Sequence, residues 1–97
     1  MPFSLVYSDA ANETLNRLEA ENTKKSAKVL KALGYMQTNI KHQGLHTHPY
    51  DARKGNNGEK IFEAYVENHT PGAYRIYWHY GPGQAVITIL AITPHPE

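Results

Sequence analysis

The chain has 97 residues, of which 40% are hydrophobic and 20% are charged, a composition typical of a folded domain and not of a disordered polymer. It contains no cysteine, which excludes a disulfide framework and thiolate chemistry, and no apolar run approaches the roughly 18 residues that cross a bilayer. The net charge of +1 does not by itself indicate a nucleic-acid binder, although the basic stretch from Lys24 to Lys60 fits either a phosphate-facing surface or a solvated helix and loop.

The first half of the chain predicts a strand followed by a helical hairpin. Phe3–Tyr7 is a short apolar run, and Ser8 directly after it is a typical helix cap. Apolar residues recur at helical spacing over residues 10–21 and again over residues 24–38. A glycine costs about 1 kcal/mol inside a helix, so the second helix either ends at Gly34 or continues to the end of that stretch.

The second half predicts three antiparallel strands. Residues 40–57 have little periodicity and several breakers, so we expect an irregular loop there. Strand patterns follow over residues 60–67, 74–80 and 85–92, and the short turns between them favour an antiparallel meander. The predicted fold class is therefore α+β, with an N-terminal strand, a helical hairpin and a three-stranded meander. These elements form one sheet with the helices packed on one face, in a single domain of residues 1–97.

Two neighbouring strands are predicted to share a face rich in ionisable and aromatic groups. With a period of two, Arg75, Tyr77 and His79 point to one side of their strand, and Glu63 and Tyr65 point to one side of the strand before it. If the strands pair across the turn between them, Glu63 lies opposite Arg75 or Tyr77. The charged residues form either a plain interstrand ion pair or a carboxylate base beside a phosphate-binding guanidinium. The aromatic rings are either ordinary strand residues or stacking surfaces for unpaired bases.

Histidines are the second group of candidates, since six occur in the chain. His42, His46 and His48 lie close together in the predicted loop, but no cysteine or carboxylate completes a metal site except Asp51, so we expect neither metal nor cofactor. Two alternatives remain for these three histidines, which are either plain surface residues or contacts to RNA. His95 follows the last strand between two prolines, and it is the candidate general acid because imidazole titrates near neutral pH. The alternative is a tail histidine without a role.

The order and spacing of these segments resemble the RelE/ParE superfamily of toxins from bacterial type II toxin–antitoxin pairs. The resemblance covers nearly all of the chain and is carried by Ser4–Tyr7, the helices, Thr38–Leu45, Lys60–Tyr65, Tyr74-Arg75-Ile76 and Ile89–His95. It implies an antiparallel sheet with a helical hairpin packed on it. It also implies either cleavage of messenger RNA in the ribosomal decoding site or, in the ParE branch, inhibition of DNA gyrase.

The leading hypothesis is a ribosome-dependent mRNA endoribonuclease that works without a metal ion. Glu63 would act as the base for the 2′-hydroxyl, Arg75 as the phosphate clamp and His95 as the acid for the leaving oxygen. The residues expected to contact the substrate are Lys54, Lys60, Tyr65, Tyr77 and His79.

Two other hypotheses stay open. A non-enzymatic inhibitor of DNA gyrase is favoured by Tyr65, which stands where many RNA-cleaving members of the superfamily place an arginine. A non-toxic module of the same fold would bind a partner segment in an apolar cleft or at a sheet edge. All three hypotheses expect a cognate antitoxin protein, which is an implication of the resemblance. A cytoplasmic location without a membrane partner is expected, because the first residues lack the basic and apolar regions of a secretory signal.

Overall fold

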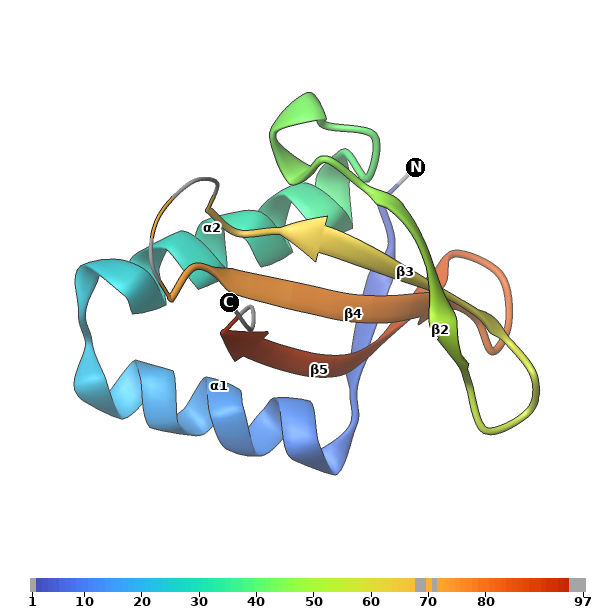
Figure 1. Cartoon of the computed structure of the whole chain (residues 1–97), viewed down its shortest axis with the longest axis horizontal. Coiled ribbons are helices and arrows are strands. Elements are labelled where there is room, and N and C mark those ends of the chain that lie inside the picture. The colour runs from blue at the N-terminus through green and yellow to red at the C-terminus, as the bar shows by residue number, and fades with distance from the viewer. Residues whose placement is uncertain (1, 68–69, 71, 95–97) are drawn as a thin grey trace.

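A computed structural model describes residues 2–67, 70 and 72–94 of the chain. The elements in chain order are β1 (Ser4–Tyr7), α1 (Asp9–Glu21), α2 (Lys24–Thr38), the 3₁₀ helix η1 (Gln43–Leu45), β2 (His48–Lys54), β3 (Lys60–Tyr65), β4 (Tyr74–Tyr80) and β5 (Val86–Pro94). This is the predicted α+β architecture, with α1 and α2 as a helical hairpin and α1 running beside β5 (Figure 1). In the described part of the chain, no helix combines the length and apolarity needed to cross a membrane.

The strands form one sheet in the order β1-β5-β4-β3-β2. Strands β3, β4 and β5 are the predicted antiparallel meander, and β1 lies parallel to β5, with Ser4 beside Val86. A parallel neighbour needs a long crossover connection, and the two helices lie within the chain between β1 and the rest of the sheet. The N-terminal strand thus belongs to the same sheet as the meander, as the sequence predicts.

The predicted irregular loop over residues 40–57 is wrong in part, because it contains η1 and the fifth strand, β2. Strand β2 lies at the sheet edge and pairs with β3, but its register slips between Pro49 and Lys54. Proline has no N–H to donate to a ladder and is tolerated on an edge strand. The edge position and the register shift explain why this segment lacks the alternating pattern of a regular strand.

Side chains at the start of each helix determine where the helices begin. Ser8 accepts a hydrogen bond from the Ala11 N–H at 3.0 Å, and Thr23 accepts one from the Ser26 N–H at 3.2 Å. The second helix continues through Gly34, because the turn after that glycine carries the fully buried Met36. The burial of this side chain outweighs the cost of one glycine in the helix.

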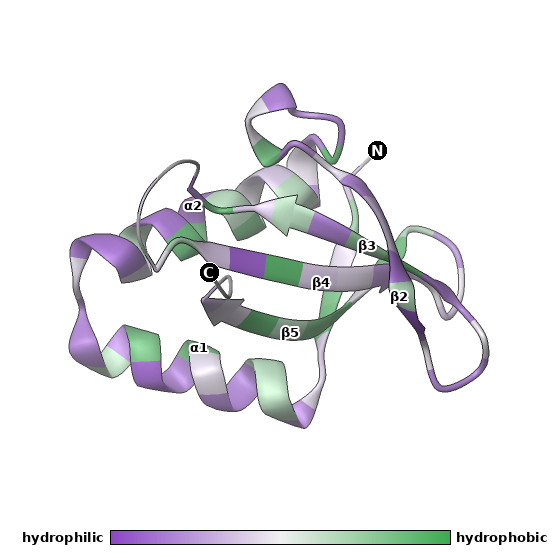
Figure 2. Cartoon of the chain, viewed as in Figure 1, coloured by the Kyte–Doolittle hydropathy of each residue, from purple (hydrophilic) through white to green (hydrophobic). Residues whose placement is uncertain are grey.

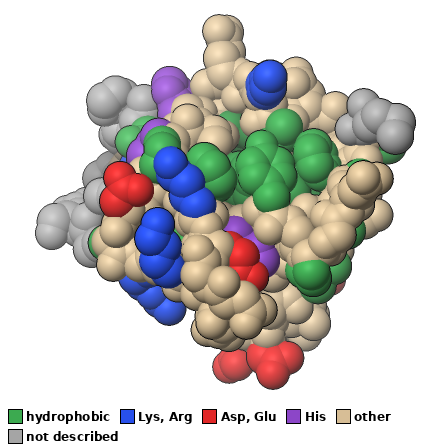
Figure 3. All heavy atoms as spheres, turned by 90° about the vertical axis from the view of Figure 1, so that its right-hand side faces the viewer, with side chains coloured by type: hydrophobic (Ala, Val, Ile, Leu, Met, Phe, Trp, Pro, Cys, Tyr) green, Lys and Arg blue, Asp and Glu red, His purple; other side chains and the backbone are tan. Residues whose placement is uncertain are grey.

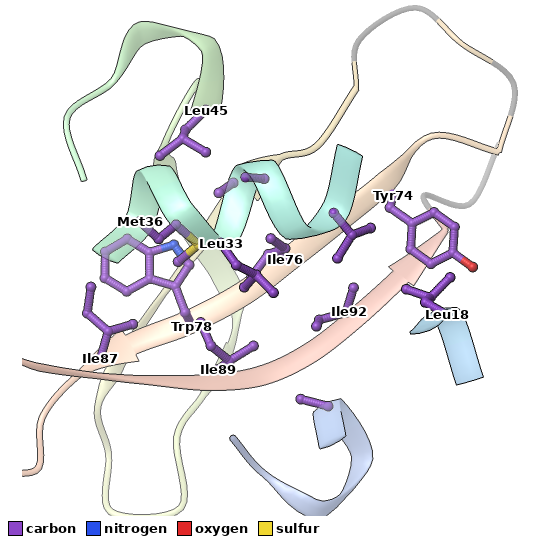
Figure 4. Close-up of a cluster of buried hydrophobic side chains, with 14 residues drawn as sticks. Leu18, Leu33, Met36, Leu45, Tyr74, Ile76, Trp78, Ile87, Ile89 and Ile92 are labelled. Carbon is purple, nitrogen blue, oxygen red and sulfur yellow. The ribbon is translucent and has the colours of Figure 1, made fainter. Parts of the chain in front are cut away.

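The core lies between the helices and one face of the sheet, and its central side chains come from β4 and β5 (Figure 4). Ile76 pairs with Ile92 and Trp78 pairs with Ile89, so both isoleucines of β5 face the helices although they are three residues apart. A β-bulge at Leu90 makes this possible, since the extra residue reverses the alternation of side chains. Hydrophobic and hydrophilic residues alternate along β3 and β4, so the opposite face of these strands is polar (Figure 2).

The end of β3 is tied to α2 by an ion-pair network at Glu67. The two carboxylate oxygens of this residue each lie 3.0 Å from a lysine Nζ, one from Lys25 and one from Lys28. The main-chain oxygen of Glu67 accepts a hydrogen bond from Arg75 Nη1 at 2.9 Å. Glu67 therefore connects the helical layer to the strand that carries the arginine of the candidate site.

Candidate functional site

The polar face of β3 and β4 carries the candidate site. The register pairs Glu63 with Tyr77 and Tyr65 with Arg75, which confirms the prediction that Glu63 lies opposite one of the two β4 residues on a shared face. Ala64 and Ile76 belong to the buried core under the helices, so the residues that alternate with them face the other way. The polar groups of two strands meet on this face.

Glu63 is the centre of a cluster of four side chains that we call the Glu63 cluster, comprising His48, Glu63, Arg75 and Tyr77. The Tyr77 hydroxyl donates to Glu63 Oε2 at 2.9 Å, and His48 Nε2 lies 2.7 Å from Oε1. Arg75 Nε lies 4.0 Å from Oε2. The carboxyl group of Glu63 thus lies among two hydrogen-bonding side chains and one guanidinium.

Arg75 is held in place by the main chain and by an aromatic ring. Its Nη1 donates to the carbonyl oxygens of Glu67 at 2.9 Å and Tyr74 at 3.2 Å, and its Cζ lies 3.7 Å from the centre of the Tyr65 ring. Only 6% of Arg75 and 6% of Glu63 is exposed, and Arg75 Nε has no hydrogen-bond partner in the described part of the chain. The guanidinium is therefore a buried charge whose position is fixed before any ligand binds.

Tyr77 acts as a hydrogen-bond donor throughout the physiological pH range. Burial raises the pKa of its phenol, and the hydrogen bond to the Glu63 carboxylate raises that pKa further. A phenol in this state keeps its proton, so Tyr77 holds the carboxylate and does not serve as a base.

His48 bridges β2 to the carboxylate. Its Nδ1 lies 2.7 Å from the main-chain oxygen of His46, and its Nε2 faces Glu63 Oε1. A carbonyl oxygen and an ionised carboxylate both only accept hydrogen bonds, so both ring nitrogens must donate for both bonds to be made. The His48 side chain is 42% exposed and that of Glu63 only 8%, so solvent and ligands reach this pair through the histidine.

A hollow of about 440 Å³ lies on the polar face beside the Glu63 cluster. Its lining includes Tyr50, Arg53, Lys54, Ile61, Tyr77 and Thr93. Tyr50 and Tyr77 are in edge contact, with ring centres 4.8 Å apart. Figure 3 shows lysine and arginine side chains grouped on the side of the molecule that carries the β2–β3 turn. Tyr77 both lines the hollow and donates a hydrogen bond to Glu63. The basic and aromatic surface of the hollow therefore lies directly beside the Glu63 carboxyl group.

The other residues singled out from the sequence lie in different surroundings. Lys60 follows the opposite alternation, with its Nζ 6.0 Å from the Phe62 ring centre. His79 is buried, and its Nδ1 lies 2.8 Å from the main-chain oxygen of Tyr80. Tyr65 lies against the Arg75 guanidinium and does not line the hollow, whereas Lys54 and Tyr77 do. His95 lies outside the described residues.

The three histidines of the segment before and within β2 point to different neighbours. The His42 ring stacks on Tyr35 of α2 at 3.9 Å between ring centres, and the His46 ring lies 5.2 Å from the Tyr65 ring. Within the described ranges, no three His, Cys, Asp or Glu side chains form a group suited to a metal ion. Of the three, His48 is the one that contacts the candidate site, through Glu63.

Sequence reasoning misses Tyr50 and Arg53 as functional residues, because the segment that carries them is predicted to be a loop. One signal was available in His48-Pro49-Tyr50, where residues two apart on a strand lie on the same face. Strand β2 brings His48 and Tyr50 to the polar face of β3 and β4. Recognition of an edge strand with a proline at its second position would have added Tyr50 to the site, whereas Arg53 lies within the register shift that follows.

Comparison with known proteins gives the fold. Three solved structures are similar over nearly the whole length of both chains. The RelE of an archaeal RelE–RelB complex from Pyrococcus horikoshii OT3 has 14% identity and a TM-score of 0.66, covering 97% of this chain and 96% of that one. A YoeB/ParE toxin from Agrobacterium tumefaciens has 8% identity and a TM-score of 0.70, covering 97% and 100%. YoeB from a Staphylococcus aureus dimer has 12% identity and a TM-score of 0.65, covering 99% and 100%.

No protein-family model and no curated protein matches the sequence. The similarity at this level of identity concerns the fold, which is the fold of RelE, YoeB and ParE toxin structures. The fold expected from the resemblance to the RelE/ParE superfamily is thereby confirmed. The activity is a separate question, because one fold carries different functions and the site must decide between them.

Proposed function

We propose that the chain is the toxin of a type II toxin–antitoxin pair and that it cleaves messenger RNA on the ribosome without a metal ion. The fold supports the first part, since it is shared with structures named as RelE, YoeB and ParE toxins. The RelE neighbour was solved in complex with RelB, which supports a cognate antitoxin protein as the partner of this chain.

The Glu63 cluster beside the basic hollow is the observation that supports RNA cleavage. Such cleavage needs a base that takes the proton of the 2′-hydroxyl, positive charge near the pentacoordinate phosphorus, and an acid for the departing 5′-oxygen. Glu63 is the base in this proposal, with its two carboxylate oxygens oriented by contacts with Tyr77 and His48. Arg75 supplies positive charge 4.0 Å from that carboxylate.

The residues that line the hollow are the proposed phosphate-binding groups. Arg53 and Lys54 line it from β2, whereas Nη1 of Arg75 is already bonded to two carbonyl oxygens. Tyr50 and Tyr77 offer ring surfaces next to these cations, and unpaired bases stack on aromatic rings. The strand that was not predicted thus contributes the phosphate-binding side chains of the proposed RNA site.

The proposal is tested by inducing the chain in a bacterial host and mapping RNA 5′ ends. Growth arrest with new ends inside translated messages is expected for the natural sequence. Glu63→Gln should reduce cleavage by about 10²- to 10⁴-fold. Replacing Arg53 and Lys54 by alanine should weaken RNA binding and reduce the slope of its salt dependence by about 2. The matched control replaces Lys24 and Lys31 of α2 by alanine, because this helix packs on the opposite face of the sheet. Intact messages during growth arrest would contradict the proposed cleavage.

Inhibition of DNA gyrase without catalysis is the second candidate, and one observation favours it. Tyr65 occupies the position of the arginine common in RNA-cleaving members, and it covers the guanidinium of Arg75 instead of leaving it open to a substrate. Cleaved gyrase–DNA complexes that accumulate while messages stay intact would support this function. Harmless expression without either effect would favour a protein-binding module of the same fold.

A further inference from the structure

We propose that His48 is the general acid of the reaction and that its proton is replaced directly from Glu63. This inference rests on the proposed RNA cleavage. The sequence suggested His95 for this role, but His48 is the histidine whose ring nitrogen lies 2.7 Å from the proposed base. A histidine and a carboxylate at this distance can exchange a proton without an intervening group.

Both ring nitrogens of His48 face hydrogen-bond acceptors. The carbonyl oxygen of His46 and the carboxylate of Glu63 can each accept one hydrogen bond from the ring, and a ring that is protonated at both nitrogens makes both bonds. Groups from several elements face His48. They are the carboxylate of Glu63 and the edge-on ring of Tyr65 from β3, the Tyr77 hydroxyl and Arg75 guanidinium beyond that carboxylate on β4, and the carbonyl oxygen of His46.

Exposure separates the two roles. The His48 side chain is the accessible member of the pair, with 42% of its surface exposed against 8% for Glu63. A scissile phosphate that approaches over the polar face therefore meets the imidazole at the rim, and the 2′-hydroxyl must reach inward to the carboxylate. The acid and the base lie on adjacent strands, β2 and β3, where His48 pairs with Glu63.

The proton transfers balance within this pair. The 2′-hydroxyl gives its proton to a Glu63 oxygen, and the 2′-oxygen forms a bond to phosphorus. A carboxyl group that has gained a proton no longer holds the Nε2 proton of His48 as strongly, so this proton passes to the 5′-oxygen as the bond from phosphorus to that oxygen breaks. The products are a 2′,3′-cyclic phosphate and a 5′-hydroxyl. The proton on Glu63 then moves to His48 Nε2, which restores the imidazolium and the carboxylate without a metal or co-reactant.

The other described histidines are less suited to the role. His79 is buried and lies near the Tyr80 carbonyl oxygen. His42 stacks on Tyr35 and accepts a hydrogen bond from the Gly44 N–H, on the side of the helices. Among the described residues, the ion pair of His48 with Glu63 is the one pair between a histidine and a carboxylate.

The test uses ribosome-bound messenger RNA in which the 5′-oxygen of the mapped cleavage site is replaced by sulfur. Thiols ionise near pH 8.5, so the sulfur leaves as a thiolate and needs no acid. On ordinary RNA, His48→Ala and His48→Gln should each lose about 10²- to 10⁴-fold in cleavage rate. On the sulfur substrate, both variants should cleave within about tenfold of the natural sequence, while Glu63→Gln stays impaired on both substrates. His42→Ala is the matched control, because it removes an imidazole from the same segment without touching Glu63.

The result can overturn the inference in several distinct ways. An equal loss on oxygen and sulfur substrates in His48→Gln, with a folded protein by circular dichroism, would make His48 a positioning residue. Rescue by sulfur of His95→Ala in place of the His48 variants would assign the acid role to the tail. Unchanged cleavage in the His48 variants would remove the residue from the mechanism. If the natural sequence cleaves neither substrate, the proposed function itself fails and this inference fails with it.

Discussion

Replacing Arg75 by methionine should strongly destabilise the fold, whatever the activity of the protein. The guanidinium is buried and lies 4.0 Å from a Glu63 carboxylate oxygen. Two opposite charges at this distance attract by about 4 kcal/mol at an effective dielectric constant of 20. Methionine keeps much of the volume but removes the charge and the hydrogen bonds to the carbonyl oxygens of Glu67 and Tyr74. Removing one partner of a buried ion pair costs about 3–5 kcal/mol, and we expect a loss in that range.

Urea unfolding followed by circular dichroism measures this loss, and a double-mutant cycle isolates the pair. Arg75→Met, Glu63→Gln and the double variant should give a coupling energy of about 1–3 kcal/mol. Arg17 and Glu21 on α1 supply the matched control, because their ion pair is exposed, with side-chain exposures of 52% and 47%. The same cycle there should give at most about 0.5 kcal/mol.

Arg75→Lys adds a second comparison, since lysine keeps the charge but not the planar fork that reaches two carbonyl oxygens. Its stability should lie between those of the natural sequence and Arg75→Met. A loss below about 1 kcal/mol for Arg75→Met would refute the reasoning, as would a coupling energy equal to that of the exposed pair on α1. Either result would mean that the burial of this guanidinium is not matched by its interactions.

Two further predictions concern stability. Burial raises the pKa of Glu67, but hydrogen bonds from two lysines of α2 more than compensate, and the net pKa lies below the ordinary value of 4.5. A carboxyl group whose pKa is lowered by folding stabilises the fold above its ordinary pKa, and this stabilisation is lost as the pH falls through the lowered pKa. The free energy of unfolding in urea should therefore exceed that of Glu67→Gln by less at pH 3 than at pH 7. A difference that does not change with pH would contradict the ion pairs assigned to Glu67. Ser8→Ala should cost about 1–2 kcal/mol in thermal unfolding, because the hydroxyl both caps α1 and donates to the Leu90 oxygen at 2.7 Å. Thr14→Ala on the exposed side of the same helix should cost less, and equal costs would show that the cap and the bulge contact contribute little.

The shared polar face could be predicted from sequence because it follows from a period of two. The alternation in Glu63, Tyr65, Arg75 and Tyr77 requires no knowledge of distant residues once both segments are recognised as strands. The same rule would have placed Lys60 with Phe62 on the other face, away from the hollow. The expectation that Lys60 binds substrate came from its charge and not from its position in the strand.

The part of the site that lies on β2 could not be predicted in the same way. The register slip after Pro49 breaks the alternation, so Tyr50 and Arg53 carry no periodic signal beyond a single pair of residues. The bulge at Leu90 is hidden for a related reason, because an unbroken apolar run fits either alternation. Both features become determined only when the strand has a neighbour whose hydrogen bonds it must match.

The chain by itself determined where its helices begin and which strand residues share a face, because caps and alternation depend on groups within about four residues of one another. Tertiary packing decided that His48 and Glu63 are in contact although 15 positions separate them in the sequence. It also decided that Arg75, which lies opposite Tyr65, is buried instead of exposed. Burial and strand register depend on the surface that a distant segment provides, and no local pattern encodes that surface.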